Sequence, residues 1–460
     1  SHHKHSITMV FQSKFSVDIP DSVPLHQYVL AKADEYGDSV AVVDGPSGFS
    51  ITYKQLKNMV FAISKNIAEK FDSKKGDVFG ILLPNHPLYP AYFHGLIAAG
   101  ATVTTINPLY TENELRKQLQ DSGARFLLTI PLFFEKAEAA VKDTNVKHIF
   151  LLSPTPDLPQ KKDETSDVTV LNGNVLLAPP SDLTPLNIAF NPKEDIAILP
   201  YSSGTTGVNK GVCLTHHNII SNLAQIDSVE NYTRDDVLIG ILPMFHIYGM
   251  VLILNMSLCK GAKVVTVPKF DFGEFLQLIQ KYKLTVLHLV PPIILALAKQ
   301  PVVANFDLTS VKFIVSGAAP LAPTLQEELK QKYNIIAKQG YGLTEASPVL
   351  CVNPSDDNRY GSSGVLLANT ELKVANIENG EELEEGQEGE LCFRGPQVMK
   401  GYLNNEEATS NTIKNGWLHT GDIGYIKDGY VYITDRLKEL IKFKGYQVPP
   451  AELEALLLKH

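Results

Sequence analysis

The stretch that decides how this chain is interpreted is residues 201–212, which reads Tyr201-Ser202-Ser203-Gly204-Thr205-Thr206-Gly207-Val208-Asn209-Lys210-Gly211-Val212. Its glycines let the backbone turn N–H groups toward an anion, its hydroxyls add donors, and Lys210 supplies a positive charge. The Walker A pattern, Gly-x-x-x-x-Gly-Lys-[Ser/Thr], does not fit these residues. A Ser/Gly/Thr-rich segment is more often only a loop. The strand pattern before it and the Gly-Val-Cys-Leu-Thr-His run after it favour a polyphosphate-binding loop instead.

On both sides of this loop, short apolar runs alternate with amphipathic helical patterns. Strands are predicted at 40–44, 77–84, 101–106, 125–130 and 147–152 before the loop, and at 195–200, 237–242, 263–267, 285–290 and 311–316 around and after it. Capping boxes beginning at Thr52 and Thr111 predict the starts of two helices. Strands separated by helices indicate βαβ crossovers and a largely parallel sheet. The polar, proline-rich segment 153–192 is interpreted as a long connection.

After about residue 370 the pattern changes to antiparallel hairpins, at 371–376, 388–394, and 422–426 with 430–434 around the Asp428-Gly429 turn. The sequence therefore predicts an α/β fold: a large N-terminal domain of two βαβ subdomains plus a small antiparallel β subdomain, followed by the truncated start of a small α+β C-terminal domain. The expected boundaries are 1–190 for the first βα subdomain, 191–370 for the second, with the phosphate loop, 371–435 for the β subdomain, and 436–460 for a hinge and the truncated domain.

Composition excludes several classes of protein. The 460 residues carry a formal charge of −9, which argues against nucleic acid as the main partner. No apolar run approaches the roughly 18 residues of a membrane span. The four scattered cysteines suit a reducing compartment, so we expect a cytoplasmic location, with a peroxisomal one left open. We also expect a monomer. The opening Ser1-His2-His3-Lys4-His5 is interpreted as a floppy terminus or cloning remnant. The Cys213-x-x-His216-His217 run is better explained by Thr215 as a helix N-cap than by a metal site.

Six further motifs follow the loop in order. They are residues 243–249 (Pro-Met-Phe-His-Ile-Tyr-Gly), 316–320 (Ser-Gly-Ala-Ala-Pro), 339–345 (Gln-Gly-Tyr-Gly-Leu-Thr-Glu), 389–395 (Gly-Glu-Leu-Cys-Phe-Arg-Gly), 417–422 (Trp-Leu-His-Thr-Gly-Asp) and 435–442 (Asp-Arg-Leu-Lys-Glu-Leu-Ile-Lys). Together with the loop they resemble the acyl-adenylate-forming superfamily of acyl-CoA synthetases, luciferases and adenylation domains. Residues 389–395 and 245–248 make 4-coumarate–CoA ligases the most similar subgroup.

The resemblance implies ATP and CoA as co-substrates, Mg²⁺ as the metal, and a small carboxylic acid as the partner to be activated. Lys210, His246, Thr344 and Glu345 would be catalytic, with Glu345, a hard oxygen ligand, holding Mg²⁺. Taken alone, Thr344-Glu345 could equally be a helix N-cap with a first-turn acid. ATP and AMP would be bound by Ser202, Ser203, Gly204, Thr205, Thr206, Gly207, Lys210, Gln339, Gly340, Tyr341, Thr344, Asp422, Arg436, Lys438, Lys442 and Gln447.

The resemblance also assigns the acid and the thiol. Tyr248, Gly317, Ala318, Gly340, Gly342, Pro348, Val349 and Leu350 would line the acyl pocket. Lys269, Lys444 and Gly445 would meet CoA. His246 would gate the pocket and the pantetheine channel, although a lone histidine between apolar residues is more often structural.

The sequence departs from the family pattern in three ways. Asn209 replaces a usual proline, and Val251 and Val315 stand where hydroxycinnamate ligases commonly carry polar residues. The chain also ends at His460, before the segment whose lysine drives adenylation in the family, which is why the C-terminal domain is expected to be truncated.

The implied activity is an ATP-dependent, AMP-forming acid–thiol ligase acting on a hydroxycinnamate-like aryl acid through an acyl-adenylate. A fatty-acyl–CoA synthetase or luciferase-like enzyme is the alternative. A non-catalytic acyl-nucleotide binding protein is the alternative of another class.

Overall fold

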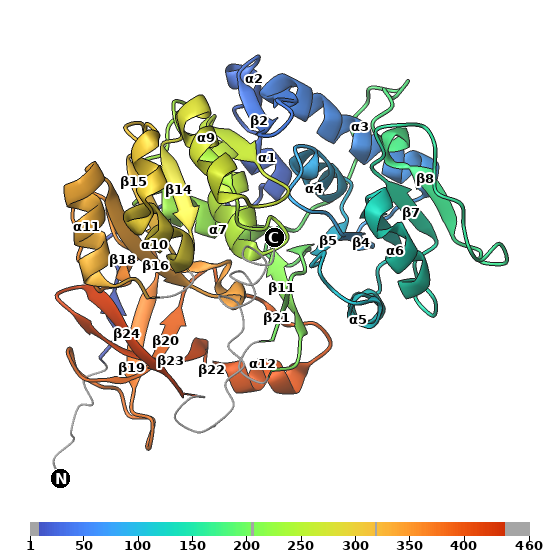
Figure 1. The fold of residues 1–460 in the computed structure, drawn as a ribbon. Coiled ribbons are helices and arrows are strands. Elements are labelled where there is room, and N and C mark those ends of the chain that lie inside the picture. Colours follow the sequence, from blue (N-terminus) through green and yellow to red (C-terminus); the bar gives the residue numbers. More distant parts are fainter. Residues whose placement is uncertain (1–8, 204–206, 318–319, 438–460) are drawn as a thin grey trace, which may run out of the picture.

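The structure is a computed structural model that describes residues 9–203, 207–317 and 320–437. Figure 1 shows two regions in which helices cover a sheet, with a smaller group of antiparallel strands below them. Within the described residues, no helix is long and apolar enough to cross a membrane. This arrangement confirms the predicted α/β fold, with a large N-terminal part and a small antiparallel β part, while the predicted C-terminal domain lies almost entirely outside the described residues.

The first sheet has the order β10-β11-β9-β5-β4-β6-β7-β8, and β21 pairs with β11. Its strands are β4 (Val78–Ile81), β5 (Thr102–Thr105), β6 (Phe126–Thr129), β7 (His148–Leu151), β8 (Thr169–Asn172), β9 (Ile196–Ile198), β10 (Tyr201–Ser202), β11 (Lys210–Thr215) and β21 (Gly401–Tyr402). From β9 to β8 the strands are parallel, whereas β10 and β11 pair antiparallel on either side of the phosphate loop.

Helices of this half are α3 (Tyr53–Phe71), α4 (Tyr89–Ala98), α5 (Glu112–Ser122), α6 (Phe134–Ala140) and α7 (His216–Asp227). The predicted capping boxes are confirmed at Thr52 and Thr111, whose hydroxyls each accept a hydrogen bond from the backbone N–H three residues later. Thr215 caps α7 in the same way. The ring nitrogen Nδ1 of His216 accepts the backbone N–H of Leu25 at 2.9 Å, so this histidine has a structural role, as expected.

The second sheet has the order β1-β19-β20-β23-β24-β18-β17-β16-β15-β14-β12-β13-β2-β3, with β22 pairing to β23. Its parallel part comprises β2 (Val40–Asp44), β12 (Val237–Gly240), β13 (Lys263–Thr266), β14 (Val286–Leu289), β15 (Phe313–Ser316) and β16 (Ile336–Gly342), with β3 (Ser50–Thr52) antiparallel at the edge. The helices η3 (Gly249–Asn255, a π-helix), α8 (Met256–Lys260), α9 (Phe272–Tyr282), α10 (Pro291–Lys299) and α11 (Pro323–Tyr333) belong to this half.

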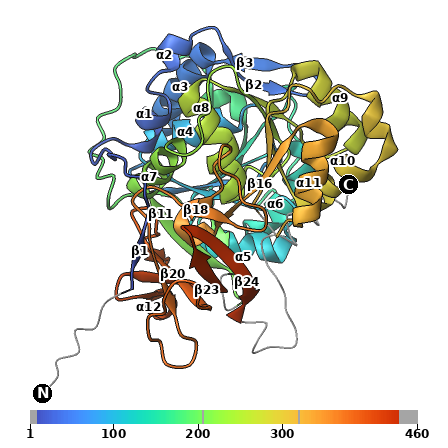
Figure 2. The same cartoon turned by 90° about the vertical axis from the view of Figure 1, so that its left-hand side faces the viewer.

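The antiparallel part consists of β1 (Phe11–Gln12), β17 (Val349–Val352), β18 (Gly364–Leu366), β19 (Glu371–Ala375), β20 (Gly389–Arg394), β22 (Ile413–Lys414), β23 (Trp417–Lys427) and β24 (Tyr430–Arg436). The predicted turn between β23 and β24 is confirmed: Asp428 and Gly429 both have positive φ, as a two-residue hairpin turn requires. In Figure 2 these strands lie below the helical layers, with α12 (Glu406–Thr412) beside them. Short helices α1 (Leu25–Val29), α2 (Ala33–Tyr36) and η5 (Thr344–Ala346) complete the elements used below.

Strand β16 joins the two parts of this sheet. Its first half pairs parallel with β15, at Ile336–Phe313 through Gln339–Ser316. Its second half, from Gly340 to Gly342, pairs antiparallel with β17. The motif of residues 339–345 therefore lies where a parallel sheet changes into an antiparallel one, next to the carboxyl ends of the parallel strands, where α/β proteins commonly bind ligands.

Two findings differ from the sequence-based expectations. The segment 153–192 contains β8, which adds a parallel strand next to β7, because Thr169–Asn172 is a short β-competent run hidden in a polar context. Each sheet also contains strands from both sides of residue 190. In the second sheet β2 pairs with β13, and in the first sheet β9 pairs with β5. Strand membership thus does not follow the chain order, and the domain boundaries drawn at 190, 370 and 435 stay a prediction.

Candidate active site

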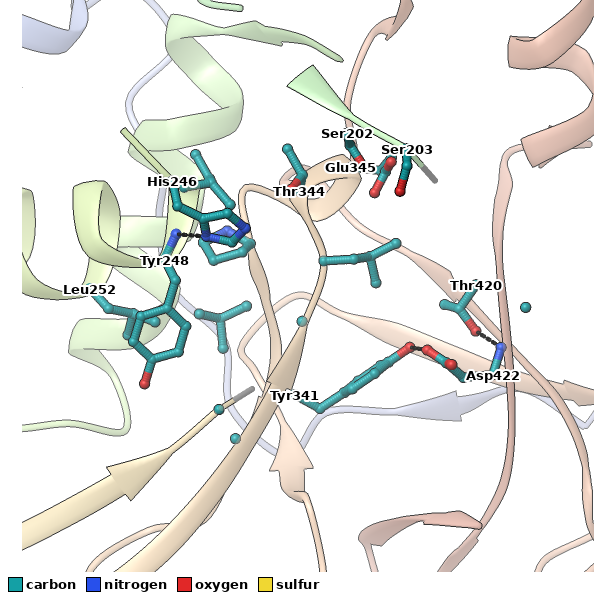
Figure 3. A pocket seen from close by; sticks show the side chains of 18 of the residues that line it. Ser202, Ser203, His246, Tyr248, Leu252, Tyr341, Thr344, Glu345, Thr420 and Asp422 are labelled. Atoms are coloured by element: carbon teal, nitrogen blue, oxygen red, sulfur yellow. Dashed lines mark hydrogen bonds between the residues drawn. The ribbon is translucent and has the colours of Figure 1, made fainter. Parts of the chain in front are cut away.

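A cavity lies where β16, η5 and β23 meet Ser202 and Ser203 (Figure 3). It is lined by Ser202, Ser203, His246, Ile247, Tyr248, Leu252, Val315, Gly317, Gly340, Tyr341, Gly342, Leu343, Thr344, Glu345, Pro348, Val349, Val352, Tyr402, Thr412, His419, Thr420, Gly421, Asp422 and Arg436. Most of these residues come from the motifs singled out in the sequence. The cavity brings together segments more than 200 residues apart.

One end of the cavity combines hydroxyls with a buried carboxylate, and a buried lysine lies near that carboxylate outside the lining. Glu345 is buried, and its Oε1 accepts a hydrogen bond from the Tyr402 hydroxyl at 3.1 Å. Burial raises the pKa of Glu345, while hydrogen bonds from Ser202 and Tyr402 and the charge of Lys210 act against that rise. Burial lowers the pKa of Lys210, which lies with its Nζ 5.4 Å from the centre of the Tyr402 ring.

This end fits a metal–polyphosphate ligand. The Oγ of Ser203 is buried and has no hydrogen-bond partner among the described residues, although it lines the cavity. A buried hydroxyl without a partner is costly, and an anionic oxygen would satisfy it. The carboxylate of Glu345 is a hard oxygen ligand of the kind that Mg²⁺ prefers, and a bound cation would favour its ionised form.

The opposite wall presents an aromatic ring and a carboxylate. The Tyr341 hydroxyl donates a hydrogen bond to Oδ2 of Asp422, and Figure 3 shows the ends of the two side chains meeting. Nε of Arg436 lies 3.5 Å from Oδ1 of Asp422. The backbone N–H of Asp422 donates to the Thr420 hydroxyl at 3.1 Å, which fixes the turn that carries the carboxylate. This wall offers a ring face for a base and oxygen acceptors for vicinal hydroxyls.

The third region is almost entirely apolar. Tyr248, Leu252, Val315, Val349 and Val352 line it. A Cβ at Gly317 would lie 2.3 Å from Cε2 of Tyr248, and a Cβ at Gly342 would lie 2.1 Å from the Pro348 carbonyl oxygen. Only glycine allows these close approaches, which let Tyr248 and the Pro348 backbone pack directly against the two backbone positions and form part of an apolar slot.

His246 lines this cavity and a smaller one. The second cavity is lined by Thr105, Asn107, Tyr110, Gln118, Pro200, Tyr201, Ser202, Ser203, Asn209, Phe245, His246, Ile247 and Thr344. Burial lowers the pKa of His246 to about 4, so the ring is neutral near pH 7. Its Nδ1 accepts the backbone N–H of Tyr248 at 3.2 Å, which orients the imidazole. A neutral ring that lines both cavities is consistent with the predicted gate, which stays a prediction.

Several predicted site residues do not line the main cavity. Gln339 is buried, and its Oε1 accepts the backbone N–H of Leu321 at 3.0 Å. Leu350 belongs with Cys351 to the core of the antiparallel part, whereas Val349 and Val352 line the cavity, since a register shift in the pairing with β16 interrupts the alternation along β17. Lys269 is exposed after β13. Lys210, at the start of β11, and Gly207 do not line the main cavity.

Of the two substituted valines, only Val315 faces the cavity, since Val251 is fully buried in η3. Nine predicted positions lie outside the described residues: Gly204, Thr205, Thr206, Ala318, Lys438, Lys442, Lys444, Gly445 and Gln447. The functional roles of the predicted residues stay predictions.

The sequence analysis did not predict that Tyr402, His419 and Thr420 line the cavity. Tyr402 reaches Glu345 because β21 pairs with β11 at Val212, a long-range pairing that leaves no local signal. His419 and Thr420 stand in the same motif as Asp422, so the motif itself was the available signal.

The comparisons with known proteins agree with this geometry. Residues 29–403 match the family described as AMP-binding enzyme. The chain is 42% identical to the probable 4-coumarate–CoA ligase 1 of Dictyostelium discoideum over 98% of this chain and 83% of that protein. It is 42% identical to 4-coumarate–CoA ligase 3 of Arabidopsis thaliana over 100% of this chain and 82% of the relative.

Among solved structures, a long-chain-fatty-acid–CoA ligase from Archaeoglobus fulgidus superposes with a TM-score of 0.81 at 29% identity, covering 99% of this chain and 90% of the other. The resemblance inferred from the seven motifs is confirmed. The chain belongs to the AMP-binding enzyme family.

Proposed function

We propose that this AMP-binding enzyme is an ATP-dependent carboxylate–CoA ligase that first forms an acyl-adenylate and then transfers the acyl group to CoA. The observation that carries the proposal is the single cavity that joins three unlike regions: the Ser203–Glu345 end, the Tyr341–Asp422 wall and the apolar slot beside Tyr248. Phosphates, adenosine and an acyl chain each match one of these regions. The curated 4-coumarate–CoA ligases that the chain resembles support the same assignment.

In the first half-reaction, a carboxylate oxygen attacks the α-phosphorus of ATP, and the bond to pyrophosphate breaks. Both reactants are anions, so the site must neutralise charge and align the reacting atoms. Ser202, Ser203 and Lys210 would hold the leaving phosphates, and Thr344 would contact the α-phosphate. Mg²⁺ held at Glu345 would neutralise phosphate charge.

In the second half-reaction, the CoA sulfur attacks the acyl carbonyl, the thiol proton leaves to solvent, and AMP departs. The thiol must reach the carbonyl without the adenylate being exposed to water. His246 is one of the residues that line both cavities, together with Ser202, Ser203, Ile247 and Thr344. This supports its predicted role as a gate, with the smaller cavity on the thiol side.

An aryl acid of the hydroxycinnamate type is the proposed substrate. The apolar region beside Tyr248 can receive a planar ring, and the 4-coumarate–CoA ligases that the chain resembles support this choice. A fatty-acyl substrate is the second candidate, because Leu252, Val315 and Val352 make the slot apolar and a fatty-acid–CoA ligase shares the fold at 29% identity.

The test is a panel of cinnamate, 4-coumarate, caffeate and fatty acids of increasing chain length, assayed for AMP release and for thioester formation with CoA. We expect AMP release that depends on both the acid and CoA, with the highest kcat/KM for an unsubstituted or singly hydroxylated cinnamate. A highest kcat/KM for a fatty acid would establish the second candidate. Absence of acid-dependent AMP release with every acid, in a protein that still binds AMP, would contradict ligase activity.

We further propose that the protein acts as a cytoplasmic monomer. The four cysteines form no disulfide, which suits a reducing compartment. Sedimentation of the purified protein and cell fractionation test the two parts separately.

A further inference from the structure

A second group of chemically reactive side chains lies beneath the nucleotide wall of the cavity. In the antiparallel pair of β20 and β23, Cys392 stands directly opposite His419. Glu390 precedes Cys392 by two residues and therefore faces the same side of the sheet. Sγ of Cys392 lies 3.4 Å from Nδ1 of His419, and the same nitrogen lies 2.7 Å from Oε1 of Glu390. Sγ and Oε1 are 3.9 Å apart.

We propose that Glu390, Cys392 and His419 form a binding site for a thiophilic divalent cation such as Zn²⁺, separate from the Mg²⁺ assigned to Glu345. Thiolate, imidazole and carboxylate are the three zinc ligands that proteins use. Around a tetrahedral zinc ion such ligand atoms are about 3.2–3.6 Å apart, given metal–ligand bonds of about 2.0–2.3 Å. Two of the three observed separations are close to that range, and the shortest must open by several tenths of an ångström.

Among the described residues, this is the one cluster of three such groups whose ligand atoms all lie within 4.8 Å of one another. An ion has access to it. Cys392 is buried, but the side chains of His419 and Glu390 are 19% and 16% exposed, and His419 lines the main cavity. Three protein ligands leave a fourth position for water, as in open zinc sites.

Without metal, the cluster is held by hydrogen bonds. Burial raises the pKa of the Cys392 thiol to about 12, so the sulfur is protonated. Metal binding therefore releases the thiol proton to solvent. The imidazole ligates through Nδ1 and carries its proton on Nε2 instead. Oε2 of Glu390 accepts the backbone N–H of Gly421 at 3.0 Å and keeps that bond while Oε1 binds the metal. Affinity should therefore rise with pH.

The site lies next to the turn that carries Asp422 in the nucleotide wall, so a bound metal would act on that turn. Gly421 immediately precedes Asp422, and the Thr420 hydroxyl donates to the Leu391 carbonyl oxygen at 2.7 Å, between Glu390 and Cys392. A metal bridging β20 and β23 would cross-link the two strands that carry these contacts. Binding of a thiophilic metal would therefore stabilise the turn that presents the Asp422 carboxylate.

The experiment is a Zn²⁺ titration of nucleotide-free protein by calorimetry, in excess Mg²⁺ so that hard-ligand sites are filled. His2, His3 and His5 are replaced by alanine in all samples, because these imidazoles would compete for zinc. We expect one equivalent of Zn²⁺, with affinity at least tenfold lower in Cys392→Ser and His419→Gln. Cys259→Ser, in α8 and outside the cluster, is the matched control and should bind like the parent.

Equal affinities in the parent and in a folded Cys392→Ser would overturn the proposal. Should either variant fold poorly, Co²⁺ added to the parent decides the question. A near-ultraviolet thiolate-to-cobalt absorption band, removed by a chelator, is the expected result. A cobalt complex without that band would show that the thiol is not a ligand, and the cluster would then be a hydrogen-bonded support for the Asp422 turn.

Discussion

The hydroxyl of Tyr248 lies 2.8 Å from Nδ1 of His288, and Nε2 of the same ring lies 3.1 Å from the hydroxyl of Tyr232. Burial lowers the pKa of His288 to about 3, with Lys338 acting in the same direction, so the ring is neutral. A neutral imidazole has one donor and one acceptor, and it can therefore link two phenols. His288 thus positions Tyr248, and with it one wall of the apolar slot, from behind.

Replacing His288 should therefore affect the acid more than the nucleotide. In His288→Leu the Tyr248 hydroxyl loses its partner, at a cost of about 1–3 kcal/mol. We expect kcat/KM for the acid to fall about 10- to 100-fold, with little change in KM for ATP. Tyr248→Phe, which removes the hydroxyl itself, is the control and should suffer less. Equal increases in KM for ATP and for the acid would argue against a positioning role.

Lys210 should act on the leaving phosphates. Its side chain lies close enough to Glu345 to influence the pKa of that carboxyl, and both are buried. Lys210→Ala should slow acid-dependent pyrophosphate exchange by on the order of 10²–10³. Binding of a stable acyl-AMP analogue should stay nearly unchanged, because that ligand lacks the β- and γ-phosphates. Equal losses for ATP and the analogue would indicate a folding role.

The apolar slot should discriminate against extra ring hydroxyls. A caffeate hydroxyl buried beside Val315 would find no partner and lose about 1–3 kcal/mol. We expect 4-coumarate to be preferred over caffeate, and Val315→Thr to narrow that preference by supplying a hydroxyl. Steady-state kcat/KM for both acids in both proteins is the measurement. A preference for caffeate in the parent protein would mean that the slot has polar contacts elsewhere.

The Tyr341–Asp422 hydrogen bond should support nucleotide affinity. Tyr341→Phe keeps the ring and removes the donor to Asp422, so we expect KM for ATP to rise severalfold while the KM for the acid stays close to the parent value. Asp422→Asn should weaken AMP binding further, since the amide offers one acceptor oxygen where the carboxylate offers two. Fluorescence titration with AMP measures both. Parent-like affinity in both variants would remove Asp422 from the ribose site.

Stability should fall as the pH is lowered from about 6.5. Burial lowers the pKa of His94 to about 4, below its ordinary value of 6.5, and lowers those of His246 and His288 to about 4 and 3. Between these values the unfolded chain binds more protons than the native one, so the free energy of unfolding decreases with falling pH. Each histidine contributes up to about 1.4 kcal/mol per pH unit.

Urea unfolding at several values between pH 7 and pH 4.5 measures this dependence. His94→Gln should show a shallower slope, because one of the titrating groups is gone. An unfolding midpoint that stays constant between pH 6.5 and pH 4.5 would contradict the sign.

Local signals in the sequence were sufficient for much of the fold. Thr52, Thr111 and Thr215 each specify a helix start through hydrogen bonds to residues three positions away, so the prediction needed no tertiary information. Most residues of the cavity were predicted for a different reason: the family resemblance assigned the motif residues to one site together.

The pairing of strands that are distant in the sequence could not be predicted. Tyr402 reaches Glu345 only because β21 lies beside β11, and Leu350 turns away from the cavity only because of the register of β17. Both depend on which strand lies next to which. Neither is encoded in the residues near it, since a short strand is compatible with many partners.

The pairing of β2 with β13 also has a consequence during synthesis. Thr266 hydrogen-bonds to the Val43 carbonyl oxygen across 223 residues. A ribosome adds roughly 5–20 residues per second, so after it has synthesised the hairpin of β2 and β3 it needs on the order of 10–45 s to synthesise β13. For that interval the apolar edge of Val40–Asp44 is without its partner strand and open to pairing with another nascent chain. Yield of this enzyme in a heterologous host should therefore depend on the chaperones that meet the first 50 residues as they emerge.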